Sequence, residues 1–354
     1  MKIIVGLVYL VLTTTLSFYS KAQINNSSIL VISGGGARGA WGAGLAKHLT
    51  TAENKNYTIA IGTITGSLMG PLVLLHKFDT LENAYTSVTP RSIFNVNPFN
   101  SKGDIKAFNG IWRALFYRTL GESKNLLTRI KQNFTLNDYN LLKKSGREFF
   151  STVTNMTDYN VYYMSTQKYS YDSTVNWIWA SANQPVFMSI YETQSNPEKG
   201  NKEKTTCYWQ DGGLREAVPL TKAINLAVDR GIYNIDVIVH STKRPTDINW
   251  TQKGVLTGLE RTIDILTESV KRQNIETGVL LDKLQNCEKE SSSTPSQLFT
   301  ISIYYMYDED YNLLSNSLLF DPMIMRTMWD SGAKGHARRS IYKVTAQSLQ
   351  SIMH

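Results

Sequence analysis

The chain has 354 residues, of which 42% are hydrophobic and 19% are charged, so it can bury a large core. This composition excludes an intrinsically disordered chain, and two cysteines, Cys207 and Cys287, are too few for a disulfide framework, although they could pair with each other. The basic residues behind the net charge of +8 are scattered, which indicates a solvated surface and gives no argument for binding nucleic acid.

Residues 1–22 have the features of a secretory signal peptide. Lys2 precedes an apolar run over residues 3–12, and Ser20 and Ala22 are small residues at the positions that a signal peptidase reads. The run is too short to span a bilayer comfortably. We therefore expect an exported protein, periplasmic or extracellular, in which residues 23–354 form a single domain whose formal charge falls from +8 to +6 with the loss of Lys2 and Lys21.

Taken in chain order, apolar segments alternate between strand-like and helix-like patterns. The predicted strands are 29–32, 57–62, 148–153, 161–164, 235–239 and 297–307. Of these, 148–153 and 161–164 are predicted to form a hairpin. The predicted helices are 40–49, 67–75 and 220–229, followed by one whose apolar face carries Leu259, Ile263, Leu266 and Val270. This order predicts an α/β fold with three α/β/α layers and a mostly parallel central sheet.

Residues 91–140 fit the alternation least well. They contain seven large apolar residues that are either part of the core or part of a cap or apolar lip that meets a membrane. These residues are Phe94, Phe99, Phe108, Trp112, Leu115, Phe116 and Tyr117. Residues 255–354 continue the helix and strand pattern but carry less diagnostic motifs.

The first strand leads into a glycine-rich loop, Gly34-Gly35-Gly36-Ala37-Arg38-Gly39. Dinucleotide-binding proteins share this spacing, but they need an acidic residue at the end of the second strand, and that strand ends in Ile61-Gly62-Thr63. The loop would also expose successive backbone amides beside a helix N-terminus, where negative charge is stabilised. This second interpretation predicts an oxyanion hole.

The second strand leads into Gly62-Thr63-Ile64-Thr65-Gly66, which has the flanking glycines of a nucleophile elbow. A β-branched isoleucine is a poor residue for such a turn, because a positive φ costs it on the order of 1–3 kcal/mol. The alternative is an ordinary strand-to-helix turn that contains an apolar residue.

Asp211-Gly212-Gly213 would be interpreted as a simple turn if it stood alone. Beside an elbow and an oxyanion loop, however, a carboxylate can accept the proton of a serine hydroxyl, and no histidine is then needed. The five histidines show no metal or triad spacing. We therefore expect neither a metal nor a cofactor.

The three segments, in this order, resemble the patatin-like phospholipase family, which pairs a glycine-rich loop, a G-x-S-x-G elbow and an Asp-Gly-Gly or Asp-Gly-Ala turn. Residues 180–187 and 213–220 look like the segments that precede and follow the family's aspartate. The resemblance, which extends from Ile29 to about Ser241, implies a lipid acyl hydrolase that acts on lipid or phospholipid and contacts membranes peripherally. It makes Asp211 the base of a serine–aspartate dyad.

The resemblance also assigns the other site residues. The amides of Gly34, Gly35 and Gly36 would form the oxyanion hole, with Arg38 fixing the loop or the charge near it. The elbow glycines would be Gly62 and Gly66, and Gly212 and Gly213 would form the turn after the base.

Ile64 departs from the family pattern, because it stands where the nucleophilic serine is expected. An isoleucine cannot form an acyl-enzyme, and Ser67 lies one helical turn away, about 5 Å along the helix. Three alternatives stay open. The chain is a hydrolase carrying an inactivating change, natural or introduced, or a lipid-binding pseudoenzyme or interaction protein, or a hydrolase with an unrecognised nucleophile. The sequence does not predict the oligomeric state.

Overall fold

The computed structural model describes residues 27–100, 105–199, 205–243, 255–290, 300–314 and 317–342. The predicted signal peptide, residues 1–22, lies outside this set, so export stays a prediction. None of the helices in these ranges has the length and apolar character that crossing a membrane requires. Cys207 is buried with a free thiol, and the side chain of Cys287 lies outside the described residues.

The strands of these ranges form one sheet with the order β5-β6-β3-β2-β1-β7-β8-β9, and β4 pairs with β3. They are β1 (Ser27–Ile32), β2 (Asn56–Gly62), β3 (Glu148–Asn155), β4 (Asn160–Ser165), β5 (Tyr191–Thr193), β6 (Cys207–Asp211), β7 (Asn234–Val239), β8 (Thr300–Tyr305) and β9 (Arg338–Tyr342). The five central strands, from β3 to β8, run parallel. The pairings at both edges are antiparallel, including the predicted hairpin of β3 and β4.

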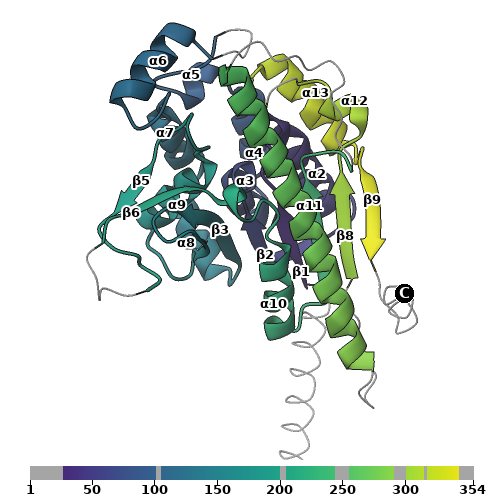
Figure 1. Ribbon diagram of the computed structural model, residues 1–354. Helices are drawn as coiled ribbons and strands as arrows, with labels where there is room; N and C mark the ends of the chain where they lie inside the picture. The colour runs from purple at the N-terminus through teal and green to yellow at the C-terminus, as the bar shows by residue number, and fades with distance from the viewer. Residues whose placement is uncertain are drawn as a thin grey trace, which may run out of the picture.

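The predicted helices are present, with ends that differ by a few residues. The helices are α2 (Gly39–Thr51), α3 (Thr65–Leu74), α4 (Phe78–Thr86), α5 (Pro90–Ile93), α6 (Ala107–Phe116), α7 (Lys124–Asn133), α8 (Leu136–Lys144), α9 (Tyr171–Ala182), α10 (Leu220–Arg230), α11 (Val255–Glu290), α12 (Asp308–Tyr311) and α13 (Pro322–Ala333). Two short 3₁₀ turns, η1 (Gly36–Arg38) and η2 (Gly212–Leu214), follow β1 and β6. Figure 1 shows α10 and α11 on one face of the sheet and α2 with α13 on the other.

Strand β1 divides the core into two layers, because its successive side chains point to opposite faces. Leu30 and Ile32 pack in the cluster that contains Trp41 of α2 and Trp329 of α13. Ile29 and Val31 pack in the cluster that contains Ile224 of α10 and other residues of that face. All four β1 side chains are fully buried. The predicted α/β/α arrangement with a mostly parallel sheet is therefore confirmed.

Some of the large apolar residues in 91–140 belong to the core, and others are exposed on the surface. Phe94 and Phe99 are buried in the core, whereas the apolar side chains at the end of α6 are exposed to solvent. The exposed residues are Trp112, Leu115, Phe116 and Tyr117. The side chain of Phe108 lies outside the described residues.

Shortening a side chain of β1 should destabilise the whole fold, since both layers meet at this strand. We expect Ile32→Ala to lower the free energy of unfolding by about 2–5 kcal/mol in urea titrations. Ile341→Ala on edge strand β9, where the side chain is 52% exposed, should cost well under half as much. Equal losses in the two variants would contradict this account of the core.

Candidate functional site

The predicted elbow is present between β2 and α3. Neighbouring backbone leaves no room for a side chain at either of its glycines. A Cβ on Gly62 would lie 2.3 Å from the carbonyl of Gly66, and one on Gly66 would lie 2.3 Å from the carbonyl oxygen of Ile32. Between them, Ile64 has φ 54° and ψ −115°. The strained conformation of an elbow is thus kept by a β-branched residue, at a cost on the order of 1–3 kcal/mol.

The side chain of Ile64 brings the three motifs together. Its Cδ1 atom lies 2.4 Å from the position of a Cβ on Gly34 and 3.1 Å from that of a Cβ on Gly213. Ile64 therefore lies between the glycine loop and the turn that follows Asp211, where the sequence predicted a nucleophile. A larger residue at position 34 would require the Ile64 side chain to move.

Two amides of the glycine loop differ from the third in their hydrogen bonding. Gly36 has φ +55°, and a Cβ there would lie 2.2 Å from the carbonyl oxygen of Ser317. The Gly34 amide already donates to the Ala217 carbonyl at 3.3 Å. Among the described residues, no acceptor takes the amides of Gly35 and Gly36. Of the three amides that the sequence assigned to an oxyanion hole, these two thus have no acceptor among the described residues.

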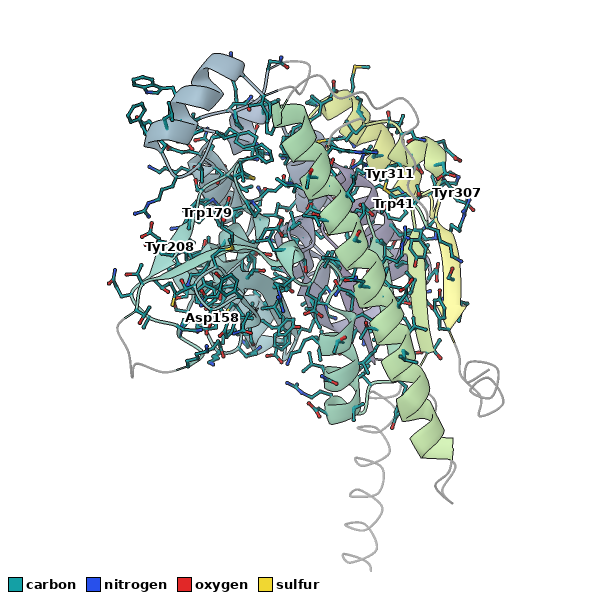
Figure 2. The ribbon with its side chains drawn as sticks, viewed as in Figure 1. Trp41, Asp158, Trp179, Tyr208, Tyr307 and Tyr311 are labelled. Carbon is teal, nitrogen blue, oxygen red and sulfur yellow. The ribbon has the colours of Figure 1, made fainter. Side chains whose placement is uncertain are left out.

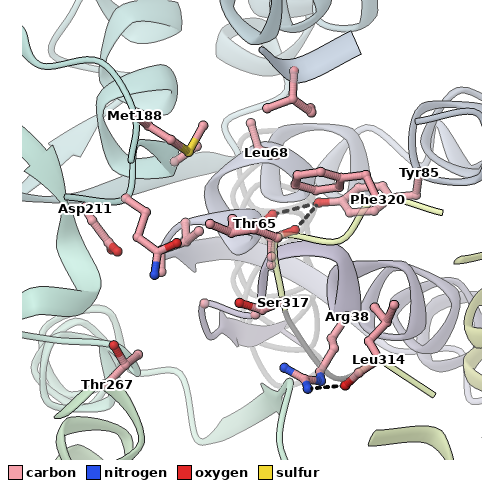
Figure 3. A pocket seen from close by; sticks show the side chains of 18 of the residues that line it. Arg38, Thr65, Leu68, Tyr85, Met188, Asp211, Thr267, Leu314, Ser317 and Phe320 are labelled. Carbon is pink, nitrogen blue, oxygen red and sulfur yellow. Dashed lines mark hydrogen bonds between the residues drawn. The ribbon is translucent and has the colours of Figure 1, made fainter. Parts of the chain in front are cut away.

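Arg38 holds a distant segment against the glycine loop. Its Nη2 donates to the Leu314 carbonyl at 2.8 Å and its Nε to the Tyr311 carbonyl at 3.3 Å. The guanidinium also lies 4.0 Å from the centre of the Tyr311 ring. Figure 3 shows the hydrogen bond between Arg38 and Leu314 beside the pocket. Of the two roles predicted for Arg38, its contacts favour fixing the loop.

Asp211 ends β6 and is buried. Its Oδ1 accepts the Gly213 amide at 2.6 Å, and its own amide donates to the Asn183 carbonyl at 3.1 Å. Gly212 is required beside it, since a Cβ there would lie 2.4 Å from the Thr152 carbonyl oxygen. Burial raises the pKa of the Asp211 carboxyl to about 7, against the lowering effects of the Gly213 hydrogen bond and the Lys271 charge. A carboxyl with this pKa can exchange a proton near neutral pH.

The two segments that flank the aspartate in sequence tie the site together. In residues 180–187, Ser181 Oγ accepts the Ile64 amide at 3.1 Å. In residues 213–220, the Glu216 carbonyl accepts Thr63 Oγ1 at 3.1 Å, and the Ala217 carbonyl accepts the amide of Gly34. Each segment therefore bonds to the elbow or to the glycine loop.

Ser67 does not replace the missing nucleophile. Its hydroxyl is fully buried, donates to the Gly62 carbonyl at 2.7 Å and lies 2.8 Å from Ser181 Oγ. These bonds hold Ser67 beneath the elbow rather than in the cavity.

His240 is a buried structural histidine between Gly35 and Gly42. Its Nδ1 lies 2.9 Å from the Ser33 carbonyl oxygen, and burial lowers the pKa of the ring to about 3, so it stays neutral. In the part of the chain that the structure describes, no cluster of three or more His, Cys, Asp or Glu side chains could hold a metal ion.

A cavity of about 1060 Å³ lies over Ile64, Asp211 and the glycine loop. One part of its wall is apolar, with Leu68, Leu72, Val88, Ile130, Ile178 and Phe320. The other part is charged and belongs to α11, with Arg261, Asp264, Glu268, Lys271 and Arg272. Figure 3 shows Leu68, Met188, Phe320 and Asp211 around this space.

The charged wall was not predicted, because the sequence pattern revealed only the apolar face of α11. Lys271 is 5% exposed, and its Nζ lies 2.6 Å from Glu268 Oε1. Glu268 Oε2 in turn accepts the Ser241 hydroxyl at 2.9 Å. Charged residues at helical spacing usually indicate a solvated face, so nothing in the sequence distinguished these side chains from surface residues.

The three motifs lie within a region that matches a known protein family. A family model described as patatin-like phospholipase matches residues 30–224, more than half of the chain. The chain belongs to the patatin-like phospholipase family. The match contains all three motifs, the strained elbow and the buried aspartate, so the resemblance stated from the sequence is confirmed.

This patatin-like protein is also similar to a solved structure. The solved structure of VipD from Legionella pneumophila is similar over 89% of this chain and 68% of that chain, with 11% sequence identity and a TM-score of 0.34. No curated protein matches the chain.

The raised pKa of Asp211 has a consequence for stability. The folded carboxyl titrates at about 7, far above its ordinary value of 3.8, so between about pH 4 and pH 7 the folded state binds more protons than the unfolded state. Stability contributed by this group is therefore lost as the pH rises through that window.

Asp211→Asn keeps an acceptor for the Gly213 amide but cannot ionise. We expect the unmodified protein to lose on the order of a few kcal/mol relative to Asp211→Asn between these pH values, as measured by urea unfolding. Other buried groups, such as His240, are common to both proteins and cancel in the comparison. Parallel stability curves for the two proteins would contradict the assignment.

Proposed function

We propose that this chain binds the acyl chain of a lipid in its cavity and, with Ile64 at the elbow, does not hydrolyse the ester. The proposal is carried by one observation: Ile64 keeps the positive φ of a nucleophile while its hydrocarbon side chain fills the space beside Asp211. The elbow geometry supports descent from a lipid acyl hydrolase, and the side chain removes the chemistry. An acyl chain fits the apolar wall of the cavity.

The step that this chain lacks is the attack of a serine hydroxyl on the ester. In a serine–aspartate dyad, the serine Oγ bonds to the ester carbonyl carbon while the aspartate takes its proton. The amides of an oxyanion hole stabilise the negative oxygen of the tetrahedral intermediate, which collapses to an acyl-serine as the aspartate gives its proton to the leaving alcohol. Water then attacks the acyl carbon while the aspartate takes its proton, and that proton returns to the serine oxygen as the acid leaves. In this chain Asp211 and the amides of Gly35 and Gly36 could serve these two roles, but Ile64 offers no nucleophilic atom.

Restoring a hydroxyl should therefore restore hydrolysis. We expect Ile64→Ser to hydrolyse a short-chain chromogenic ester at least about a hundredfold faster than Ile64→Ala, which lacks the hydroxyl but opens the same space. The double variant Ile64→Ser with Asp211→Ala should fall back to the level of Ile64→Ala. Phospholipid vesicles in place of the ester would test the lipid class.

Two results would argue against this account of the site. Activity in the unmodified protein, abolished by a serine-directed covalent probe, would indicate an unrecognised nucleophile. A folded but silent Ile64→Ser would indicate a site that has lost more than its nucleophile, and the proposal would then rest on lipid binding alone.

Lipid binding can be tested without any turnover. We expect the unmodified protein to bind a monomeric fluorescent fatty acid, and Leu68→Trp to bind it at least about tenfold more weakly, because space for two methylenes of about 0.8 kcal/mol each is lost. Leu141→Trp is the matched control, since Leu141 is 48% exposed on α8. Equal affinity in the two variants would place the probe elsewhere.

We also propose that the protein is exported, on the basis of the apolar run and small residues in residues 1–22. N-terminal sequencing of the protein recovered from cell fractions would test cleavage after Ala22. An intact Met1 in the cytoplasmic fraction would contradict export.

A further inference from the structure

The exposed face of α6 is unusually apolar. Trp112, Leu115 and Phe116 lie at positions i, i+3 and i+4, so they share one side of the helix. They are 58%, 71% and 65% exposed, and Tyr117, directly after the helix, is 54% exposed. The rings of Trp112 and Phe116 lie 4.5 Å apart. Large apolar side chains gathered in this way indicate an interaction surface.

Polar contacts hold α6 with this face outward. Arg113, whose side chain is 12% exposed, donates to Glu122 at 3.1 Å and to the Thr119 carbonyl at 3.0 Å. Just before the helix, Lys106 Nζ donates to the Asn97 carbonyl at 3.1 Å. Polar contacts made just before α6 and near its end therefore tie it to the neighbouring chain, while Trp112, Leu115 and Phe116 stay exposed.

The segment that carries α6 is built onto the wall of the cavity. Ile105, just before α6, pairs with Phe99, and the Phe99 ring lies 6.1 Å from that of Phe94. The Phe94 ring lies 6.4 Å from that of Phe320, which lines the cavity. A chain of aromatic contacts thus joins the base of α6 to the cavity.

Two other exposed apolar residues lie close to the cavity. Ile265 of α11 lines it and is 55% exposed, and Met323, three residues after Phe320, is 82% exposed. Figure 1 shows α6, the beginning of α11 and the beginning of α13 along the same edge of the molecule. We call these two residues, the three of α6 and Tyr117 the apolar rim.

We propose that the apolar rim docks on the surface of a lipid bilayer and so presents the cavity to its ligand. The inference rests on the proposed lipid-binding function. Three features favour a bilayer as the occupant. Tryptophan and tyrosine prefer the boundary between headgroups and acyl chains, the formal net charge, +6 without residues 1–22, is of the sign that anionic lipid surfaces attract, and the rim adjoins a cavity with an apolar wall.

The test uses sedimentation of the full chain with vesicles of phosphatidylcholine containing phosphatidylglycerol. We expect the unmodified protein to bind, and the double variant Trp112→Ser with Phe116→Ser to bind at least about tenfold more weakly, because two aromatic side chains no longer enter the interface. Tyr159→Asn is the control, since Tyr159 is 75% exposed in the turn between β3 and β4. Figure 2 shows its neighbour Asp158 on the same side of the molecule as α6 but well below it.

The outcomes separate this inference from the proposed function. A monomeric fluorescent fatty acid reports on the cavity alone, so the double variant should bind it as the unmodified protein does. Vesicle binding that is absent in the unmodified protein, or unchanged in the double variant, would overturn the docking inference even if the fatty acid binds. A double variant that changes the oligomeric state in light scattering but not vesicle binding would assign the rim to self-association and would also overturn it.

Discussion

The site depends on how closely three stretches of backbone approach one another. β1 passes so near the start of α3 that a Cβ on Gly66 would lie 2.3 Å from the Ile32 carbonyl oxygen, and the same crowding holds between Gly62 and Gly66. With both glycines in place, Ile64, the middle one of the three residues between them, takes a sharp turn with φ 54°. Ile64 holds this positive φ in spite of its β-branched side chain, as a residue does where the surrounding structure fixes the backbone.

Hydrogen bonds join the other parts of the site to one another, and in each of them the donor or the acceptor is a backbone group. The elbow amide is held by Ser181, the aspartate amide by Asn183, and the first glycine of the loop by Ala217. None of these bonds involves the side chain at position 64. The framework is therefore independent of the nucleophile, which explains how it can persist around an isoleucine.

The sequence predicted the parallel core and the three motifs because both depend on local patterns. The fully apolar run of β1 indicated a strand buried on both faces, and the glycines marked the places where backbones meet. The antiparallel edge formed by β5 and β6 was missed, since its strands are short and pair through contacts distant in sequence. The charged wall of α11 was missed for a related reason. Lys271 resembles any surface lysine until the fold buries it against Glu268.

The C-terminal part of the chain has a role that the extent of the family match does not suggest. The match ends at residue 224, yet the Ala37 amide bonds to the Ser317 carbonyl, the Arg38 guanidinium to Tyr311 and Leu314, and the Trp41 indole to the His336 carbonyl. The glycine loop is thus shaped by residues almost three hundred positions away. A fragment limited to the matched region would keep every motif and lose the acceptors that give the loop its conformation.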